Sequence, residues 1–357
     1  MKKIVLTGGG TAGHVMPNIA LLKYLDDFEV HYIGSLQGIE KDILSAYPNV
    51  TYHGIHTGKL RRYLSGQNIK DFFNVIKGSY ESTRLLKQIR PDIIFSKGGY
   101  VAVPVANGAK KCHIPLITHE SDMTLGLANK IIAKVACLVL TTFPETAALI
   151  ENGKGKYSGP PIRPDLFDGD RQRGLDFLGF NGDKPVLLVT GGSTGSTRIN
   201  EAVYAAVSRL CERFDVVHLC GGKKMIKLEN PPENYRQYPF VSKEISDVFA
   251  CTDYVLTRGG SNAICELAAL KKPMLIVPLE KASRGDQVLN AKSFVKRGMA
   301  IMLGEEAMTP ETILEKLDEL VQKKDSLVEA MAAQNFQNGV EFIYNEIVAE
   351  LKRRGIE

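Results

Sequence analysis

Long apolar stretches are absent from this sequence of 357 residues. No uninterrupted apolar run approaches the roughly 20 residues that a membrane-spanning helix needs. The chain starts with Met-Lys-Lys-Ile-Val-Leu-Thr, which leads directly into a predicted strand and a glycine-rich turn and leaves no room for the apolar core of a signal peptide. We therefore expect a cytoplasmic protein whose contact with a membrane is at most peripheral.

Paired cysteines and metal-ligand clusters are missing as well. The six cysteines form no Cys-x-x-Cys pair and mostly lie within apolar runs, as small hydrophobic residues of a reducing compartment do. The sequence has no histidine-rich cluster. Asp168-Gly169-Asp170 matches a pattern of metal-dependent nucleotide-sugar enzymes, but it follows no buried strand, so we interpret it as a solvated turn. The sequence thus predicts neither disulfides nor a bound metal.

Net charge is low, with 45 basic residues against 40 acidic ones and a balance of +5. This excess is too small to imply nucleic acid as a partner, and no nucleic-acid-binding motif is present. One segment nevertheless has a local positive excess suited to anionic lipid, formed by Lys59, Arg61, Arg62, Lys70, Lys77, Arg84, Lys87 and Arg90. Apolar residues recur beside it at helical spacing, namely Ile69, Phe72, Phe73, Ile76 and Tyr80. This stripe is either an interfacial surface or ordinary core with a charged outer face.

The length predicts two domains of about 160 to 180 residues. Strand-like runs alternate with helical patterns in both halves, which is typical of parallel sheets covered by helices on both faces. The expected fold class is therefore α/β, with two Rossmann-like, doubly wound sheets. Three prolines within Ser158–Pro164 suppress helix and indicate the hinge. We assign residues 1–160 to the first domain and 161–336 to the second, and expect a final helix at about 337–357 to pack back on the first.

Two matched glycine-rich turns, Gly8–His14 and Gly191–Ser196, each join an apolar strand to an amphipathic helix. Glycines let the backbone approach an anion, and the helix N-terminus attracts it, so pyrophosphate or sugar phosphate is the natural ligand. Ligands of open parallel sheets bind beyond the carboxyl ends of the strands. Both turns should therefore line one interdomain cleft.

The first turn matches the Gly-x-Gly-x-x-Gly fingerprint of dinucleotide-binding proteins. The second strand, however, ends at Tyr32–Ser35 without the acidic residue that holds the ribose hydroxyls. A nicotinamide or flavin enzyme and a purely structural pair of turns are the minor alternatives. His14, which directly follows the turn, is a candidate general base or a donor to an anionic substrate, unless it only satisfies backbone groups.

Polar residues also follow other predicted strands. Lys97–Tyr100 and His119–Asp122 occupy equivalent positions in the first half. In the second half, Arg258–Glu266 opens a further helix, whose glutamate either binds ribose hydroxyls or only interacts with the helix dipole. The polar loop Lys281–Asn290 follows a strand and is expected to line the site.

Seven short motifs occur in an order that resembles the MurG family of peptidoglycan lipid-intermediate N-acetylglucosaminyltransferases, in glycosyltransferase family 28, across nearly the whole chain. They are Gly9–His14, Gly98–Val101, His119–Glu120, Gly126–Lys130, Gly191–Ser193, Gly260–Glu266 and Asp286–Ala291. The resemblance implies a GT-B fold that transfers GlcNAc from UDP-GlcNAc to the muramoyl 4-hydroxyl of undecaprenyl-pyrophosphoryl-MurNAc-pentapeptide, with inversion and without a cofactor. It further implies a peripheral enzyme of the cytoplasmic membrane face, acting in cell wall biogenesis, cell shape and cell division.

The resemblance also implies roles for individual residues. His14 is the first candidate for the general base and Glu120 the second. Residues implied to bind UDP-GlcNAc are Thr11, Ala12, Gly13, Asp122, Arg163, Ser193, Val241, Ser261, Asn262, Ala263, Ile264, Glu266 and Gln287. Among these, Glu266 would hold the ribose, Ser193 and the Ser261–Ile264 amides the diphosphate, and Gln287 the sugar hydroxyls. Residues implied to meet the acceptor are Gly10, Gly98, Gly99, Tyr100 and His119.

Four positions depart from the family pattern. Ala12 replaces a glycine, Asp122 an asparagine, Leu125 a common proline, and Pro160 an asparagine or threonine. Asp122 therefore places a carboxylate where the family has an amide that contacts the donor sugar. The sequence leaves open a transferase acting on another lipid such as diacylglycerol, a UDP-sugar epimerase, and a non-catalytic UDP-sugar sensor.

Overall fold

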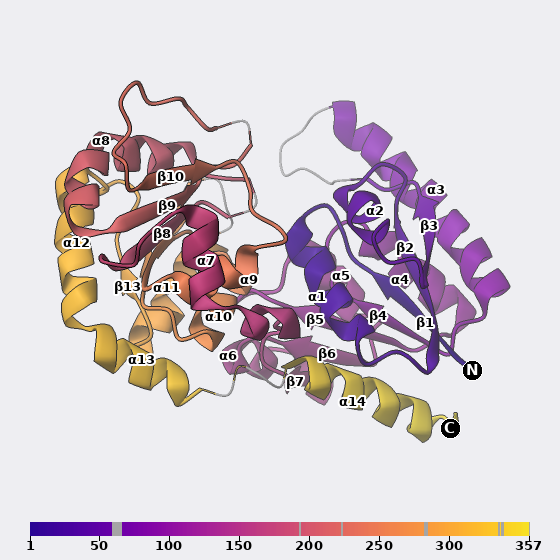
Figure 1. Cartoon of the computed structure of the whole chain (residues 1–357). Helices are drawn as coiled ribbons and strands as arrows, with labels where there is room; N and C mark the ends of the chain where they lie inside the picture. Colours follow the sequence, from indigo (N-terminus) through magenta and orange to yellow (C-terminus); the bar gives the residue numbers. More distant parts are fainter. Residues whose placement is uncertain are drawn as a thin grey trace. The chain divides into compact units, whose positions relative to one another are not determined.

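The computed structural model describes residues 1–58, 66–192, 194–222, 224–281, 285–334, 336 and 339–356, with the side chains of 66–70 left aside. The chain divides into two compact units (Figure 1). The first comprises Met1–Arg163 together with Gln337–Glu357, and the second comprises Pro164–Phe336.

The first unit contains a seven-stranded sheet in the order β3-β2-β1-β4-β5-β6-β7, with every neighbouring pair parallel. The strands are β1 (Lys2–Thr7), β2 (Phe28–Ser35), β3 (Val50–Ile55), β4 (Ile93–Ser96), β5 (Leu116–Glu120), β6 (Leu138–Thr141) and β7 (Gly155–Tyr157). The chain winds outward from β1 to β3 and then returns to β4 on the other side of β1. The winding direction therefore changes between β1 and β4, and this switch point is where ligands of open parallel sheets bind.

Helices cover both faces of this sheet. They are α1 (Ala12–Leu22), α2 (Ile39–Leu44), α3 (Gly66–Ile89), α4 (Ala102–Cys112), α5 (Leu127–Ala133), α6 (Pro144–Ala148) and α14 (Gly339–Arg353), with a 3₁₀ turn at Glu151–Gly153. Successive strand residues point to opposite faces, so Ile4 and Leu6 enter one apolar cluster and Val5 enters another. The central strands are buried on both sides and are therefore almost continuously apolar.

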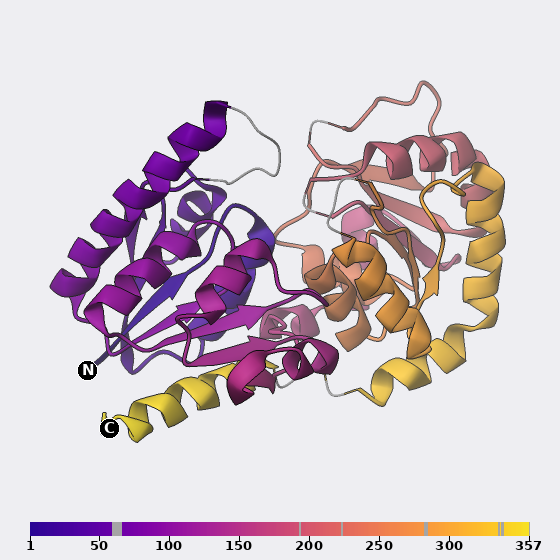
Figure 2. The same ribbon diagram turned by 180° about the vertical axis from the view of Figure 1, so that it is seen from behind.

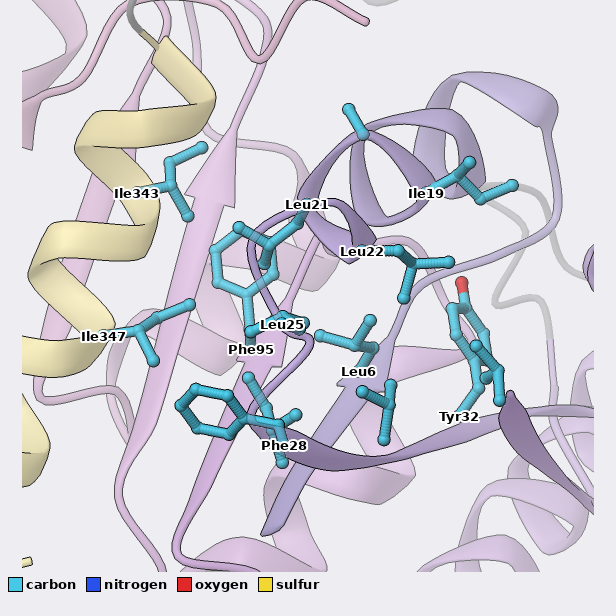
Figure 3. Packing of buried hydrophobic residues seen from close by; sticks show 14 of the residues in the cluster. Leu6, Ile19, Leu21, Leu22, Leu25, Phe28, Tyr32, Phe95, Ile343 and Ile347 are labelled. Carbon is cyan, nitrogen blue, oxygen red and sulfur yellow. The ribbon is translucent and has the colours of Figure 1, made fainter. Parts of the chain in front are cut away.

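The C-terminal helix α14 contributes to the first of these clusters. Its residues Ile343 and Ile347 lie four apart on one helix face and point toward Phe95, with Leu6 and Phe28 nearby (Figure 3). The last segment of the chain thereby completes the core of the unit that contains the first residues.

The second unit contains a six-stranded parallel sheet in the order β10-β9-β8-β11-β12-β13. The strands are β8 (Val186–Thr190), β9 (Asp215–Leu219), β10 (Tyr235–Tyr238), β11 (Tyr254–Thr257), β12 (Met274–Ile276) and β13 (Ile301–Met302). The helices are α7 (Arg171–Leu178), α8 (Thr197–Arg213), α9 (Ile245–Cys251), α10 (Ser261–Ala269), α11 (Asp286–Lys296), α12 (Pro310–Gln322) and α13 (Lys324–Ala332), after a 3₁₀ turn at Pro164–Asp168. The switch point lies between β8 and β11. The expected fold class, two doubly wound parallel sheets, is confirmed.

Helix α3 carries the apolar stripe along the outer side of the first unit (Figure 1 and Figure 2). Phe72 is 56% exposed, Phe73 64%, Ile76 51% and Tyr80 71%. The alternative that this stripe is ordinary core is therefore wrong. Ile69 and the basic residues Lys59, Arg61, Arg62 and Lys70 lie outside the described side chains. Among the described residues, no helix combines the length and the apolar character that crossing a bilayer requires.

A buried histidine on β9 makes the stability of the second unit sensitive to acid. His218 Nδ1 lies 2.8 Å from the Tyr235 hydroxyl and Nε2 lies 3.0 Å from Asn200 Oδ1. The Asn200 amide nitrogen donates to Cys220 O, so its oxygen accepts from Nε2–H, and Nδ1 accepts from the tyrosine. Burial lowers the pKa of His218 from 6.5 to about 4.

We predict that the free energy of unfolding falls as pH decreases from 6.5 toward 4. In this window the unfolded chain binds a proton at His218 that the folded chain does not, which costs at most about 1.4 kcal/mol per pH unit. Urea titrations followed by circular dichroism at pH 4.5 to 7.5 measure this slope. His218→Gln should flatten it, whereas His113→Asn, at an exposed position, should leave it unchanged. Equal slopes in wild type and His218→Gln would contradict the assignment.

Candidate active site

The first glycine-rich turn carries Thr11 and His14 at the start of α1. Thr11 is the N-cap residue of α1, but its side chain makes no capping hydrogen bond. Instead, Thr11 Oγ1 lies 2.8 Å from His14 Nδ1. A base acting through Nε2 needs its ring proton on Nδ1, and that N–H can donate to the threonine oxygen. The Thr11 hydroxyl is thus placed to select the tautomer and orient the ring.

The loop after β4 lies against this turn. Gly98 and Gly99 both have φ of +79°, where a side chain would be strained. A Cβ on Gly99 would lie 2.7 Å from Gly9 O and 3.4 Å from the His14 ring, and a Cβ on Gly10 would lie 2.5 Å from the Tyr100 ring. The structure therefore brings the expected acceptor residues of both loops together around His14.

His119, at the end of β5, is fully buried and bonded on both sides. Its Nδ1 lies 2.6 Å from Lys97 Nζ, and its Nε2 lies 3.3 Å from Gly159 O. Burial and then the charge of Lys97 hold the pKa of His119 well below its usual value. The neutral ring thus accepts a hydrogen bond from the Lys97 ammonium and donates one to the Gly159 carbonyl. His119 therefore links Lys97 to the hinge segment.

Both carboxylate oxygens of Glu120 are engaged by the loop that follows β5. Oε1 accepts from the Asp122 N–H at 3.0 Å, and Oε2 accepts from the Gly126 N–H and the Asn129 side-chain amide, each at 2.9 Å. Burial and then the charge of Asp122 raise the pKa of Glu120. A raised pKa suits a general base. The three hydrogen bonds, however, indicate that Glu120 fixes the conformation of the loop formed by residues 121–126.

In the second unit, the helix that follows β11 begins with open backbone. Gly260 is the N-cap of α10 and provides no side-chain cap, and a Cβ placed on it would meet none of the described atoms within 4 Å. Its φ of −68° is ordinary, so backbone strain does not demand glycine here. The first turns of α10 carry the expected donor residues Ser261, Asn262, Ala263, Ile264 and Glu266.

The second glycine-rich turn lies across the switch point from α10. Gly192 has φ of +78°, and a Cβ on it would meet nothing within 4 Å in the described part of the chain. Gly191 and Gly195, by contrast, pack against Ser196 N and Cys220 O. Ser193 lies outside the described residues, as do Ala282, Ser283 and Arg284 of the polar loop. Among the described residues, Gly192 and Gly260 thus leave open space near the carboxyl ends of β8 and β11.

Gln287 and Val241 are held by their own unit. Gln287 Oε1 accepts from the Leu279 N–H at 2.9 Å, and a Cβ on Gly259 would lie 2.5 Å from Gln287 O, so this residue lies next to the start of α10. Val241 is buried and belongs to the segment that connects β10 to α9. Arg163 is the last residue of the first unit.

Two buried cations, Lys97 and Arg258, lie in the predicted strand-end segments, and the sequence did not indicate a role for either. Lys97 bonds to His119 and to the Ser121 hydroxyl. Arg258 bonds through Nη2 to Ser196 Oγ and to Glu305 Oε1, each at 2.5 Å, and through Nη1 to Val277 O at 3.1 Å. Each cation directly follows a buried strand. This position at a strand end is the feature of the sequence that could have identified them.

The comparisons with known proteins cover both units. The description "Glycosyltransferase family 28 N-terminal domain" matches residues 4–141, and "Glycosyltransferase family 28 C-terminal domain" matches residues 186–347. A relative from Lachnoclostridium phytofermentans is 48% identical over 346 residues, which cover 96% of this chain and 97% of the relative. It is named UDP-N-acetylglucosamine N-acetylmuramyl-(pentapeptide) pyrophosphoryl-undecaprenol N-acetylglucosamine transferase.

Solved structures share the fold at lower identity. The crystal structure of Acinetobacter baumannii MurG has a TM-score of 0.74 at 24% identity, covering 98% of this chain and 100% of that one. UDP-GlcNAc 2-epimerase from Neisseria meningitidis, bound to UDP-GlcNAc, has a TM-score of 0.69 at 13% identity, covering 98% and 100%. At these identities the likeness shows the fold alone.

Two doubly wound parallel units of this kind define a protein of the GT-B class. The match of both domain descriptions and the identity over nearly the full length go further. The chain belongs to glycosyltransferase family 28, and the resemblance carried by the seven motifs is confirmed.

We predict that Arg258→Met destabilises the second unit by about 3 to 5 kcal/mol, because it leaves the buried Glu305 carboxylate without its charge partner. The double variant Arg258→Met/Glu305→Leu removes both charges and should recover much of this loss. Urea unfolding of the three proteins measures both effects. A double variant no more stable than the single one would show that lost packing, and not an unpaired charge, is the cause.

Proposed function

We propose that this protein transfers GlcNAc from UDP-GlcNAc to the 4-hydroxyl of MurNAc in undecaprenyl-pyrophosphoryl-MurNAc-pentapeptide, with inversion. The observation that carries the proposal is the 48% identity, over 96% of the chain, to a relative named for this transfer. The resulting disaccharide lipid is a peptidoglycan precursor, so the activity would serve cell wall biogenesis and, through it, cell shape and division.

The second unit would bind the donor. Amides of Ser261–Ile264 at the uncapped start of α10 would hold the diphosphate together with the turn that contains Ser193, and the open backbone at Gly192 and Gly260 supports this. Glu266 would accept the ribose hydroxyls, Gln287 would contact the GlcNAc hydroxyls, and the backbone at Val241 would bind uracil. From the first unit, contacts to the donor would come from Thr11, Ala12, Gly13, Asp122 and Arg163.

The first unit would bind the acceptor through the loops gathered around His14, with Gly10, Gly98, Gly99 and Tyr100 as its surface and His119 as a support. His14 Nε2 would remove the proton from the attacking 4-hydroxyl while Nδ1–H donates to Thr11. The hydroxyl oxygen would bond to C1 of GlcNAc as the bond from C1 to the UDP oxygen breaks. Helix and backbone dipoles at the donor site would stabilise the charge on the departing UDP, so we expect no metal to be required.

The exposed stripe on α3 would hold the enzyme on the cytoplasmic face of the membrane. Phe73, Lys77, Tyr80, Arg84 and Lys87 recur at spacings of three and four residues and therefore share one helix face. All five are exposed, and Phe72 and Ile76 lie beside them. Aromatic side chains with neighbouring cations suit peripheral binding to anionic lipid, where the acceptor is anchored.

The test of the function is transfer of labelled GlcNAc from UDP-GlcNAc to a short-chain pyrophosphoryl-MurNAc-pentapeptide lipid, with and without EDTA. Product in both samples is expected. Transfer to diacylglycerol but not to the muramoyl lipid would identify a different lipid acceptor. Release of free sugar without any acceptor would indicate an epimerase. Tight UDP-GlcNAc binding without turnover would indicate a sensor.

We predict that His14→Ala lowers turnover by about 100-fold or more, because it removes the base. The affinity for UDP-GlcNAc, measured by calorimetry, should change little, because the donor is held mainly by the other unit. Near-normal turnover of this variant would rule out His14 as the base.

The matched variant Glu266→Ala should, in contrast to His14→Ala, lower the affinity for UDP-GlcNAc. Loss of a charged hydrogen-bond acceptor should weaken UDP-GlcNAc binding by about 1.5 to 3 kcal/mol in the same calorimetric experiment. Unchanged affinity would refute the ribose assignment.

We predict that Phe72→Ser/Phe73→Ser weakens binding to phosphatidylglycerol vesicles by more than about tenfold, because burying one such side chain contributes about 1.5 to 3 kcal/mol. Vesicle sedimentation measures the affinity, and Leu149→Ser, at another exposed apolar position, is the control. Equal sedimentation of all three proteins would mean that α3 is not the membrane surface.

A further inference from the structure

A buried carboxylate lies directly beneath the first glycine-rich turn. Glu40, in α2, has no exposed surface. Its Oε2 accepts the Gly10 N–H at 3.2 Å, and its Oε1 accepts the Ser35 N–H at 2.9 Å and the Ser35 hydroxyl at 2.5 Å. Glu40 is the acceptor in each of these bonds.

The glycines of the first turn make room for the protein's own atoms. A Cβ on Gly9 would lie 2.6 to 2.8 Å from the Glu40 carboxylate group, and a Cβ on Gly8 would lie 2.6 Å from His14 O. Tyr100 fills the corresponding space beside Gly10. The matched glycine of the second turn, Gly192, instead faces open space among the described residues. The two turns look alike in sequence, but internal packing accounts for the glycines of the first.

Glu40 also acts on the tyrosines beside the first turn. Burial and then the charge of Glu40 raise the pKa of both Tyr52 and Tyr100, whose rings lie near it. The Gly10 amide donates to Glu40 and is therefore committed within the protein. The buried cations of the two units, Lys97 after β4 and Arg258 after β11, occupy equivalent positions, so Glu40 is an additional feature of the first turn.

We propose that Glu40 is a positioning residue for the transfer reaction: its bond to the Gly10 amide holds the first turn in the shape that orients Thr11 and His14. Thr11 and His14 then face the attacking sugar hydroxyl of the acceptor. This inference rests on the proposed function.

Steady-state kinetics of Glu40→Gln, with both substrates varied, tests the proposal. A glutamine has one acceptor oxygen, so it can accept from only one of the Gly10 and Ser35 backbone N–H groups, and its NH2 group meets the other donor. The support of the turn is thereby weakened. A displacement of about 1 Å at a reacting group costs on the order of 100-fold in rate. We expect kcat to fall by about 30- to 100-fold. The KM values for acceptor and donor should stay within about threefold, because the variant changes the position of the reacting groups and not the groups that bind the substrates.

The matched control is Glu29→Gln, which alters a carboxylate on the neighbouring β2 that bonds to Lys3 and His31. Its kinetics should equal those of wild type. Ser35→Ala is the second variant, to be used if Glu40→Gln does not fold. It removes one donor to Glu40 and keeps the charge, and we expect a several-fold fall in kcat with unchanged KM values.

Two results would overturn the inference while the function stands. Wild-type kinetics in Glu40→Gln, or in Ser35→Ala if that variant replaces it, would show that Glu40 does not position the turn. A change in acceptor KM of more than about tenfold with kcat retained would show that Glu40 supports acceptor binding and does not position the reacting groups. Absence of transfer by the wild-type protein would instead overturn the proposed function and the inference with it.

Discussion

Burial of both faces of two parallel sheets is the constraint on which the rest of this structure depends. Helices cover the sheets on each side, so side chains within the strands must be apolar on both faces. Polar chemistry is therefore confined to the strand ends. The transition is visible within single strands: β1 changes from Leu6 to Thr7, β4 from Phe95 to Ser96, and β11 from Leu256 to Thr257. Beyond these residues lie the turns that carry the candidate site.

Buried charges then give the two sets of turns different properties. Glu40 occupies the Gly10 amide in the first unit, and the Lys97 ammonium bonds to His119 at the end of β5. In the second unit, the Arg258–Glu305 pair ties β11 to the N-terminus of α8 and to the segment after β13. Arg258 and Glu305 compensate each other's charge, because an uncompensated buried charge would be strongly destabilising, whereas Glu40 and Lys97 form hydrogen bonds to uncharged polar groups. Hydrogen bonds from these buried groups thereby fix the conformation of the glycine-rich turns in the absence of substrate.

The sequence was sufficient to predict the central strands, because β1, β4, β8 and β11 each contain a short apolar run bounded by polar residues. It did not indicate β3 and β10, whose residues include Thr51, His53 and Arg236 and show no apolar run. Edge strands pair with one neighbour only and tolerate such polar side chains. The two-residue β13 is too short to leave a pattern.

The sequence by itself determined the order of strands, turns and helices, and with it which residues stand at strand ends. These are local properties, set by hydrophobic periodicity and by glycine and proline. The tertiary structure alone decided which strand ends are neighbours and which charges are compensated. Glu40 contacts Gly10, thirty residues before it, because β1 and β2 pair side by side. Likewise, periodicity placed Phe73 and Tyr80 on one helix face, but only the packing of the unit decided that this face is exposed. Contacts between distant segments and the burial of a helix face depend on the assembled sheet, which no local pattern encodes.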